Sequence, residues 1–200
     1  MHYCCHLYTK EFPTDGVIEN AMAPYYEERY YEERETDESI SRPVILYDYY
    51  IVGGRYGGVL KLDWTKEKYK PHCFLPYKRA GRLFRSAYLE RTAYGTLEWT
   101  DWLKVRDNKL EELYAMQYCG AKEGSDGMRV DGALICDLTN FNEIADACYC
   151  VIDTDGKAYA RETFDRDNWV DTPNFDETVK AIVEKNREND CYLTVIDIHD

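Results

Sequence analysis

The sequence predicts an α+β domain in which helices pack on a mostly antiparallel sheet. Two observations support this class. Strand-like runs follow one another through short turns, such as the Asp-Gly turn TDGK at residues 154–157, and helical segments lie between these runs. The length of 200 residues fits one domain. We therefore expect residues 1–200 to form a single domain, with residues 65–127 as an insertion or an elaboration of it.

The first third of the chain predicts strand, helix and hairpin in that order. The opening run HYCCHLYT alternates sides like a strand, and EFPTDG after it is rich in turn residues. Residues 17–38 are expected to be helical, with Pro24 placed in a first turn. Residues 44–52 give the strongest strand signal, and VLKLDW at residues 59–64 alternates again. The glycines between these two runs are therefore expected to turn a strand–turn–strand hairpin.

The middle of the chain is less regular. Residues 65–107 are basic and aromatic, and we expect a loop with a short helix there. Residues 107–119 have the spacing of an amphipathic helix. RVDGALICDL at residues 129–138 predicts a strand, and NFNEIADA at residues 140–147 predicts a short helix or turn.

The last third predicts a hairpin, a helix and a final strand. ACYCVID and AYARETF, at residues 147–153 and 158–164, are joined by the Asp-Gly turn. Residues 174–189 have helical periodicity, and CYLTVIDIH at residues 191–199 closes the chain as a strand. The expected buried stripe of the helix is Phe175, Val179, Ile182 and Val183.

The cysteines and the hydropathy pattern predict a reduced, cytoplasmic protein. Six of the eight cysteines lie in apolar, strand-like runs, and the sequence contains no CxxC pair, so we expect mostly buried thiols and no zinc ribbon. The sequence contains no run of about 18 apolar residues, so no membrane helix is expected, and the first residues lack the pattern of a signal peptide. The six cysteines are Cys4, Cys5, Cys136, Cys148, Cys150 and Cys191.

The net charge of −13 argues against direct, non-specific binding of nucleic acid, which depends on lysine and arginine neutralising phosphates. The charge is compatible with a basic protein partner and equally with solubility alone. Tyrosine is unusually frequent, with 19 residues against 6 phenylalanines. Its apolar body and polar tip suit interfaces and the walls of ligand sites.

The stretch GGRYGG at residues 53–58 is not a phosphate-binding loop of the nucleotide-binding folds, because those loops lead into a helix and this one leads into a strand. Gly53 and Gly54 are expected to take positive φ in the turn. The turn does not explain Gly57 and Gly58, whose lack of a side chain would be required only if a backbone or a ligand approaches them closely. Arg55 between the two pairs either binds a phosphate or carboxylate ligand, or forms a salt bridge with a carboxylate such as Asp48.

The C-terminal DIHD places Asp197 and His199 on one face of the last strand. A carboxylate beside an imidazole can act as a general base or bind a metal, and a strand leaving the core can end in the same residues. His2, Cys4 and His6 share a face of the first strand and are chemically suited to zinc, but no fourth ligand accompanies them. We expect neither a metal nor a cofactor.

Four stretches, HYCCHLY, IENAMAPYYEE, DYYIVGGRYGG and CYLTVIDIHD, together resemble a family of uncharacterised phage and prophage proteins. Members of that family have an acidic APY-type segment, a D-W-Y-x-I-G-G-R-W-x-G block and a final strand similar to LTVVDCH. The resemblance covers both ends and residues 18–64. Tyr49 and Tyr56 stand where the family prefers tryptophan, and Ile198 replaces its cysteine. The matching positions are His2, Pro24, Asp48, Tyr50, Gly53, Gly54, Arg55, Tyr56, Gly58, Asp197 and His199.

The resemblance implies a phage or prophage setting inside a bacterial host, and it suggests a geometry. If the first and last strands pair antiparallel, His2 and His199 lie at one edge of the sheet, where Asp48 and Arg55 can join them. The expected site for a ligand or partner consists of Arg55, Gly53, Gly54, Gly57, Gly58, Tyr50, Tyr56, Asp48, His2 and His199.

Three functions are compatible with these observations. The favoured one is a binding protein that interferes with a host process, such as a defence system, by capturing a host protein or sequestering a small anionic, nucleotide-like ligand. The second is a small enzyme acting on a phosphate-bearing substrate, with Arg55 holding the anion and His199 with Asp197 or Asp48 as acid and base. The third is a structural or virion-associated protein. The sequence leaves the oligomeric state open.

Overall fold

A computed structural model gives the fold of residues 1–62, 74–76, 128–144, 148–165 and 168–200. Its centre is an eight-stranded sheet, whose path runs in the order β3-β5-β10-β1-β6-β7, with β2 added to β10 and β4 added to β5. The prediction of an α+β fold with a mostly antiparallel sheet is confirmed, because among the described strands only β1 and β6 pair in parallel. The strands are β1 (His2–Thr9), β2 (Tyr49–Val52), β3 (Leu60–Leu62), β4 (Phe74–Pro76), β5 (Met128–Leu134), β6 (Cys150–Ile152), β7 (Ala158–Ala160) and β10 (Tyr192–His199).

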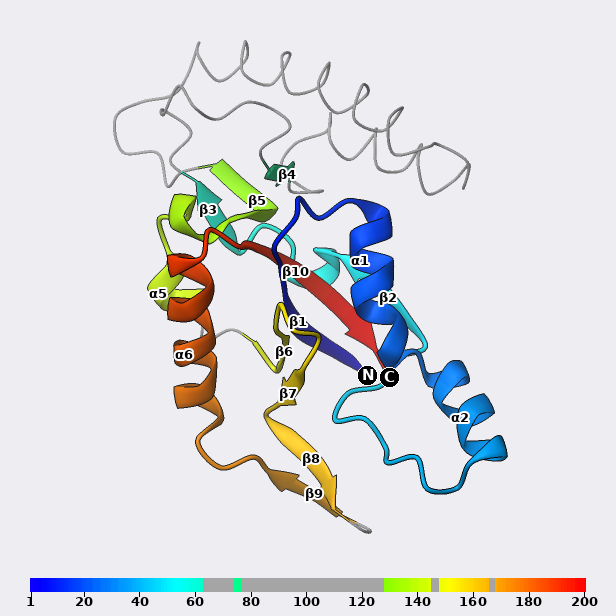
Figure 1. Cartoon of the computed structure of the whole chain (residues 1–200). Coiled ribbons are helices and arrows are strands. Elements are labelled where there is room, and N and C mark those ends of the chain that lie inside the picture. The colour runs from blue at the N-terminus through cyan, green and yellow to red at the C-terminus, as the bar shows by residue number, and fades with distance from the viewer. Residues whose placement is uncertain (63–73, 77–127, 145–147, 166–167) are drawn as a thin grey trace.

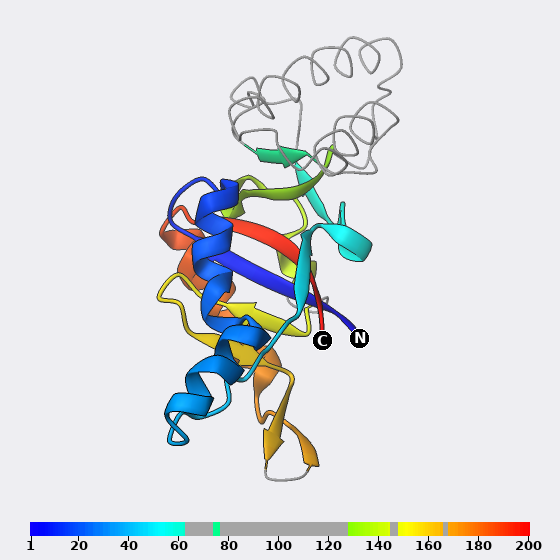
Figure 2. The same cartoon turned by 90° about the vertical axis from the view of Figure 1, so that its right-hand side faces the viewer.

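Helices cover both faces of the sheet (Figures 1 and 2). The helix α6 (Phe175–Glu188) packs on one face, and its predicted stripe is buried in full against residues of β1, β5 and β10. The helix α1 (Asp15–Met22) packs on the other face through Ile18 and Met22, which share a buried cluster with side chains on the opposite face of β1 and β10. The central strands are therefore covered on both faces. This explains why they are apolar at consecutive positions.

The predicted helix over residues 17–38 is interrupted. The helix α1 begins earlier than expected, because the Thr14 side chain caps it by accepting a hydrogen bond from the Val17 amide at 3.3 Å. A short 3₁₀ turn, η1 (Ala23–Tyr25), follows with Pro24 in its first positions, and α2 (Glu27–Thr36) starts a new helix. The acidic segment is thus two helices and not one.

The predicted strand over residues 44–52 is shorter than expected. Regular pairing starts only at Tyr49, whereas Ile45, Leu46 and Tyr47 are buried without joining a strand. Tyr47 exchanges backbone hydrogen bonds with Tyr25 and Glu27, at 3.1 Å and 2.9 Å, and so ties this segment to the helical region. Hydrophobic content predicted the burial here, but not the conformation.

The remaining predictions on described residues agree with the structure at their centres, except that the strand expected at residues 158–164 is divided at Arg161 between two sheets. The strand predicted at residues 129–138 corresponds to β5, which begins one residue earlier, and to the 3₁₀ turn η4 (Ile135–Asp137); α5 (Phe141–Ile144) is the short helix. The Asp-Gly turn joins β6 to β7, with Gly156 at φ 78°. A second hairpin of β8 (Glu162–Asp165) and β9 (Asn168–Asp171) was not predicted. The expected helix at residues 107–119 and the expected loop at residues 65–107 lie outside the described residues, apart from β4.

The described cysteines are free thiols, and Cys4, Cys5, Cys148, Cys150 and Cys191 are buried as predicted. Cys136 is the exception, since it is the middle residue of the η4 turn and is exposed. Within the part of the chain that the structure describes, no helix is long and apolar enough to cross a membrane.

Candidate functional site

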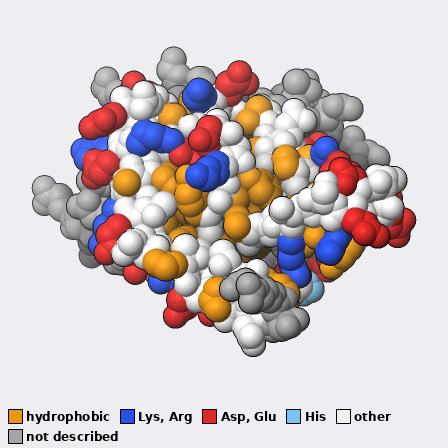
Figure 3. All heavy atoms as spheres, turned by 60° about the horizontal axis from the view of Figure 1, so that its bottom comes forward, with side chains coloured by type: hydrophobic (Ala, Val, Ile, Leu, Met, Phe, Trp, Pro, Cys, Tyr) orange, Lys and Arg blue, Asp and Glu red, His pale blue; other side chains and the backbone are white. Residues whose placement is uncertain are grey.

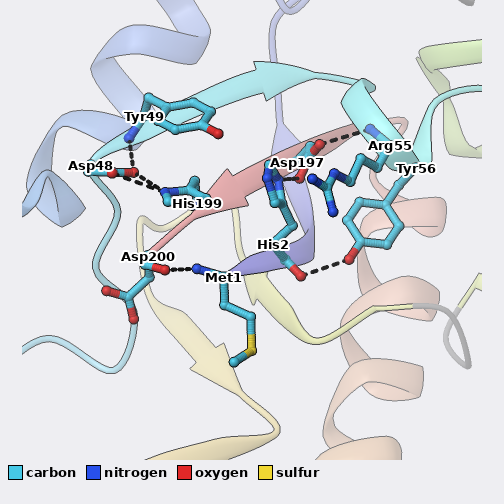
Figure 4. Close-up of polar contacts among 9 residues, drawn as sticks. All are labelled: Met1, His2, Asp48, Tyr49, Arg55, Tyr56, Asp197, His199 and Asp200. Atoms are coloured by element: carbon cyan, nitrogen blue, oxygen red, sulfur yellow. Dashed lines mark hydrogen bonds and ion pairs between the residues drawn. The ribbon is translucent and has the colours of Figure 1, made fainter.

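Two histidines from opposite ends of the sequence meet at the end of the central strands. The antiparallel register of β1 and β10 pairs His2 with His199, and their ring centroids lie 4.8 Å apart with an interplanar angle of 67°. Tyr49 of β2 is the neighbour of His199 on its other side, and its ring stacks on that imidazole at 4.7 Å. The proximity expected from pairing of the first and last strands is therefore confirmed (Figure 4).

Each imidazole is held by its own carboxylate. His2 Nδ1 lies 2.9 Å from Asp197 Oδ1, and His199 Nδ1 lies 2.8 Å from Asp48 Oδ1. Because an ionised carboxylate can only accept, each Nδ1 carries the proton of its hydrogen bond. In a neutral imidazole the lone pair is then on Nε2. Among the described residues, neither Nε2 has a hydrogen-bond partner.

The two Asp–His pairs have different surroundings. Asp197 is buried, with 2% of its side chain exposed, and His2 is 17% exposed. Asp48 is 47% exposed and His199 31% exposed, so this pair is open to solvent. Although partial desolvation opposes the effect, hydrogen bonds from His199 and from the Tyr49 amide hold the pKa of the Asp48 carboxyl below its usual value. Asp48 is consequently a fixed negative charge beside His199 at neutral pH.

The glycine stretch wraps the backbone around two buried carboxylates. Gly53 and Gly54 have φ values of 72° and 51°, and a Cβ atom on them would collide with Asp131 and Asp197 respectively. The Arg55 amide donates to Asp197 Oδ2 at 2.8 Å. Close approach of the backbone to these acceptors, in addition to the turn, therefore explains the first glycine pair.

The second glycine pair is partly explained in the same way. Gly58 has φ 75° and donates its amide to Asp131 Oδ1 at 2.8 Å, whereas Gly57 has an ordinary φ of −59°. The residues between form the 3₁₀ turn η2 (Gly54–Tyr56). The predicted hairpin is wrong, because β2 pairs with β10 and β3 pairs with β5. The stretch connects two different positions of the sheet, which a local pattern cannot indicate.

Arg55 does not form the expected salt bridge with Asp48, which binds His199 instead. Its side chain is exposed and points toward His2 and Asp197 (Figure 4), and its guanidinium has no hydrogen bond or ion pair within the described part of the chain. Tyr56 beside it donates to the His2 carbonyl at 2.9 Å. Burial, followed by the nearby Cys4 and Asp197, raises the pKa of Tyr56, which therefore remains a neutral donor.

Tyr50 is the predicted site residue that the structure places elsewhere. It lies opposite Ile198 in the register of β2 and β10, and it packs into the core on the α1 face, with its ring 5.5 Å from that of Tyr47. Asp197 and Asp131, in contrast, lie in the site although the sequence did not predict them as part of the ligand site. Asp197 entered the sequence prediction only as a catalytic alternative, and Asp131 was not expected in the site, yet both hold the glycine loop. Their only signal was a carboxylate within a strand-like run.

A hollow of about 440 Å³ is lined in part by Tyr56, whose hydroxyl donates to the His2 carbonyl. Its lining mixes aromatic rings, two buried thiols and a guanidinium that is already paired with Asp176 at 2.8 Å. Tyrosine faces of this kind suit the stacking of a planar ring. The lining residues are Tyr3, Cys4, Tyr56, Cys148, Tyr149, Arg161 and Asp176.

A second, more apolar groove lies between the β8–β9 hairpin and residues 42–46. Figure 3 shows hydrophobic side chains gathered at the centre of this face, with charged side chains around them. Phe164 and Trp169 are 43% and 51% exposed, and Arg42 lies over their rings at 5.3 Å and 5.9 Å. The groove contains no titratable cluster comparable to the two Asp–His pairs.

The structure gives no support for zinc on β1. His2, Cys4 and His6 do share a face of the strand, but His2 is bound to Asp197 and His6 is fully buried. Over the described ranges, no three His, Cys, Asp or Glu residues are grouped so that they could hold a metal ion.

Comparison of the chain with protein-family models, with curated proteins and with solved structures finds no significant match.

Proposed function

We propose that the protein binds a small, phosphate-bearing, nucleotide-like ligand at His2, His199 and Arg55. Sequestering this ligand in the cytoplasm of a bacterial host would interfere with a host process, as expected for a phage- or prophage-encoded protein. The observation that carries the proposal is the arrangement of two carboxylate-held imidazoles 4.8 Å apart, beside an arginine without an ion pair in the described chain.

The chemistry of these groups suits a phosphate. A guanidinium offers a planar fork of donors for phosphate oxygens, and a protonated imidazole whose Nδ1 is occupied can donate only from Nε2. Each neighbouring carboxylate is hydrogen-bonded to an imidazole, and a protonated imidazole balances the negative charge of its carboxylate. Asp197 accepts from His2 and from the Arg55 amide, and Asp48 accepts from His199 and from the Tyr49 amide.

The hollow beyond Tyr56 favours a nucleotide over inorganic phosphate. It has room for a planar base, its wall includes Tyr149, and it is lined by Tyr56, the neighbour of Arg55 in the sequence. Stacking of a base on an aromatic ring contributes roughly 1–3 kcal/mol. The ligand is expected to be small, because a net charge of −13 repels an extended polyanion.

The resemblance noted in the sequence is consistent with this site. Of the positions that match the phage family, His2, Asp48, Arg55, Asp197 and His199 come from three separate stretches, and all of them meet here. Five of the matching residues thus form one cluster, whereas Pro24 and Tyr50 lie outside it.

Isothermal titration calorimetry with ribonucleotides, dinucleotides and inorganic phosphate tests the proposal. Replacing Arg55 with alanine removes a charge-assisted hydrogen bond, so we expect nucleotide affinity to fall about 10- to 100-fold. Tyr149→Ala should weaken nucleotide binding while leaving phosphate binding unchanged.

The matched control is Arg29→Ala. Arg29 is an exposed arginine of α2 that pairs only with Glu33 at 2.7 Å among the residues described, and its loss should leave the affinity unaltered. Absence of binding to every nucleotide and to phosphate would contradict the proposal. An equal loss in Arg29→Ala and Arg55→Ala would show that general surface charge, and not this site, attracts the ligand.

A further inference from the structure

We infer that the two imidazoles cleave a small ribonucleotide at its 3′,5′-phosphodiester, with the neighbouring 2′-hydroxyl as the nucleophile. The inference rests on the proposed function, because the phosphate must first bind between the histidines and Arg55. It goes further by assigning a reaction to the same site.

The tautomers provide the basis for this inference. In His2 and His199 the proton on Nδ1 is held by Asp197 and Asp48 respectively, so Nε2 is the nitrogen left for a substrate. A neutral imidazole in this state is a base at Nε2, and a protonated one is an acid at the same atom. Two such groups on adjacent strands can therefore act on one substrate at two of its oxygens.

The reaction balances without any further reactant. One neutral imidazole takes the proton of the 2′-hydroxyl at Nε2, and the 2′-oxygen forms a bond to phosphorus. The bond from phosphorus to the 5′-oxygen breaks, its electron pair stays on that oxygen, and the second, protonated imidazole supplies a proton there. The products are a 2′,3′-cyclic phosphate and a free 5′-hydroxyl.

The surrounding residues have distinct tasks in this step. The Arg55 guanidinium stabilises the negative charge that increases on the phosphoryl oxygens in the transition state. Asp197, Asp48 and the stacked ring of Tyr49 are positioning residues, because they fix the orientation of the two imidazoles and contact no substrate atom.

The substrate class follows from charge and chemistry together. The mechanism needs a 2′-hydroxyl next to the phosphate, which only a ribonucleotide has. The acidic surface disfavours long RNA, because a chain with net charge −13 gains little from counterion release. Short ribonucleotides with one or two phosphodiesters satisfy both conditions.

The test uses the full-length protein and the dinucleotide uridylyl-3′,5′-adenosine, with the 2′,3′-cyclic product measured by chromatography. His2→Gln and His199→Gln should each lower the cleavage rate roughly 10²- to 10⁴-fold. The matched control is His6→Leu. His6 is a buried histidine on the same strand as His2 but outside the site, so this variant should cleave the dinucleotide at the wild-type rate. The 2′-deoxy analogue should bind in calorimetry and remain intact.

A substrate with sulfur in place of the bridging 5′-oxygen separates catalysis from structure. Its leaving thiolate needs no proton, so the variant lacking the general acid should regain most of its rate, while the other variant stays slow. A merely structural role for the histidines would slow both variants equally on both substrates, and that result overturns the inference.

The remaining outcomes distinguish the inference from the proposed function. If the deoxy analogue binds but the ribonucleotide is not cleaved, the inference fails and the binding function stands. If neither compound binds and none is cleaved, both fail. Cleavage that survives unchanged in His2→Gln and His199→Gln also overturns the inference, because it assigns the activity to another site.

Discussion

A buried histidine should make the protein sensitive to acid. His6 of β1 is completely buried, and neither of its ring nitrogens has a hydrogen-bond partner among the described residues. Burial lowers the pKa of His6 to about 4, because the core cannot solvate the imidazolium. The unfolded chain takes up this proton near pH 6.5. Between these values the unfolded state binds more protons, so stability is lost as the pH falls.

The size of the effect follows from the two pKa values. A difference of about 2.5 units corresponds to roughly 3 kcal/mol of unfolding free energy, lost between about pH 7.5 and about pH 4. His6→Leu removes the titrating group at similar volume. The difference in stability between the variant and the wild type should therefore change by about 3 kcal/mol over this range, in favour of the variant at low pH. With an m-value on the order of 2 kcal/mol/M, the urea midpoint should shift by about 1.5 M.

Urea unfolding followed by circular dichroism at the two pH values measures this difference. Tyr8→Phe is the matched control, because the Tyr8 hydroxyl is also buried without a partner in the described chain, on the same face of β1. Burial raises the pKa of Tyr8 further above its usual range, so its removal should change stability equally at both pH values. A pH-independent difference between His6→Leu and the wild type would refute the reasoning.

Two further substitutions test the supports of the fold. Gly54→Ala places a Cβ atom against Asp197 at φ 51° and should lower the unfolding free energy by at least about 2 kcal/mol. The control is Gly16→Ala, because a Cβ atom at this position of α1 enters open space and should not lower the unfolding free energy. Thermal denaturation measures both variants. Asp153→Ala should cost about 1–3 kcal/mol, because one hydrogen of the buried Asn186 amide loses its acceptor while the other still donates to the Ile182 carbonyl. Burial opposes ionisation of Asp153, but hydrogen bonds from Lys185 and Asn186 outweigh it and lower the pKa of Asp153. The stability that the ionised Asp153 contributes is therefore present above about pH 4 and is lost as the pH falls through the lowered pKa. Urea unfolding should then give the same stability for the wild type and the variant below that pKa.

The sequence predicted those parts of the fold that depend on local periodicity. The strand-like runs of β1 and β10 and the stripe of α6 are properties of neighbouring residues, and all three elements lie where they were expected. The meeting of His2 and His199 could be predicted as well, since one antiparallel register between the first and last strands is enough to bring them together.

The parts that failed depend on contacts between distant residues. The sequence around GGRYGG shows two strands and a turn, but it does not show that Asp131 and Asp197 lie underneath as buried acceptors. These acceptors draw the amides of Arg55 and Gly58 toward two different strands, so β2 and β3 separate and join β10 and β5. A local hairpin would leave the two buried carboxylates without these donors, at a cost of about 1–3 kcal/mol or more for each group.

The two Asp–His pairs differ in how firmly each imidazole is held, and Asp197 is the cause of this difference. Its two oxygens accept from His2 Nδ1 and from the Arg55 amide, so one buried carboxylate fixes both an imidazole and the backbone that carries the guanidinium. Among the residues that the structure describes, the Asp48 carboxylate accepts only from His199 and from the neighbouring Tyr49 amide, in a position open to solvent. Since a buried carboxylate cannot lose a partner without a large penalty, His2 and Arg55 are held as a rigid unit. His199 is the more adjustable group, and a ligand that enters between them would be accommodated on the side of Asp48.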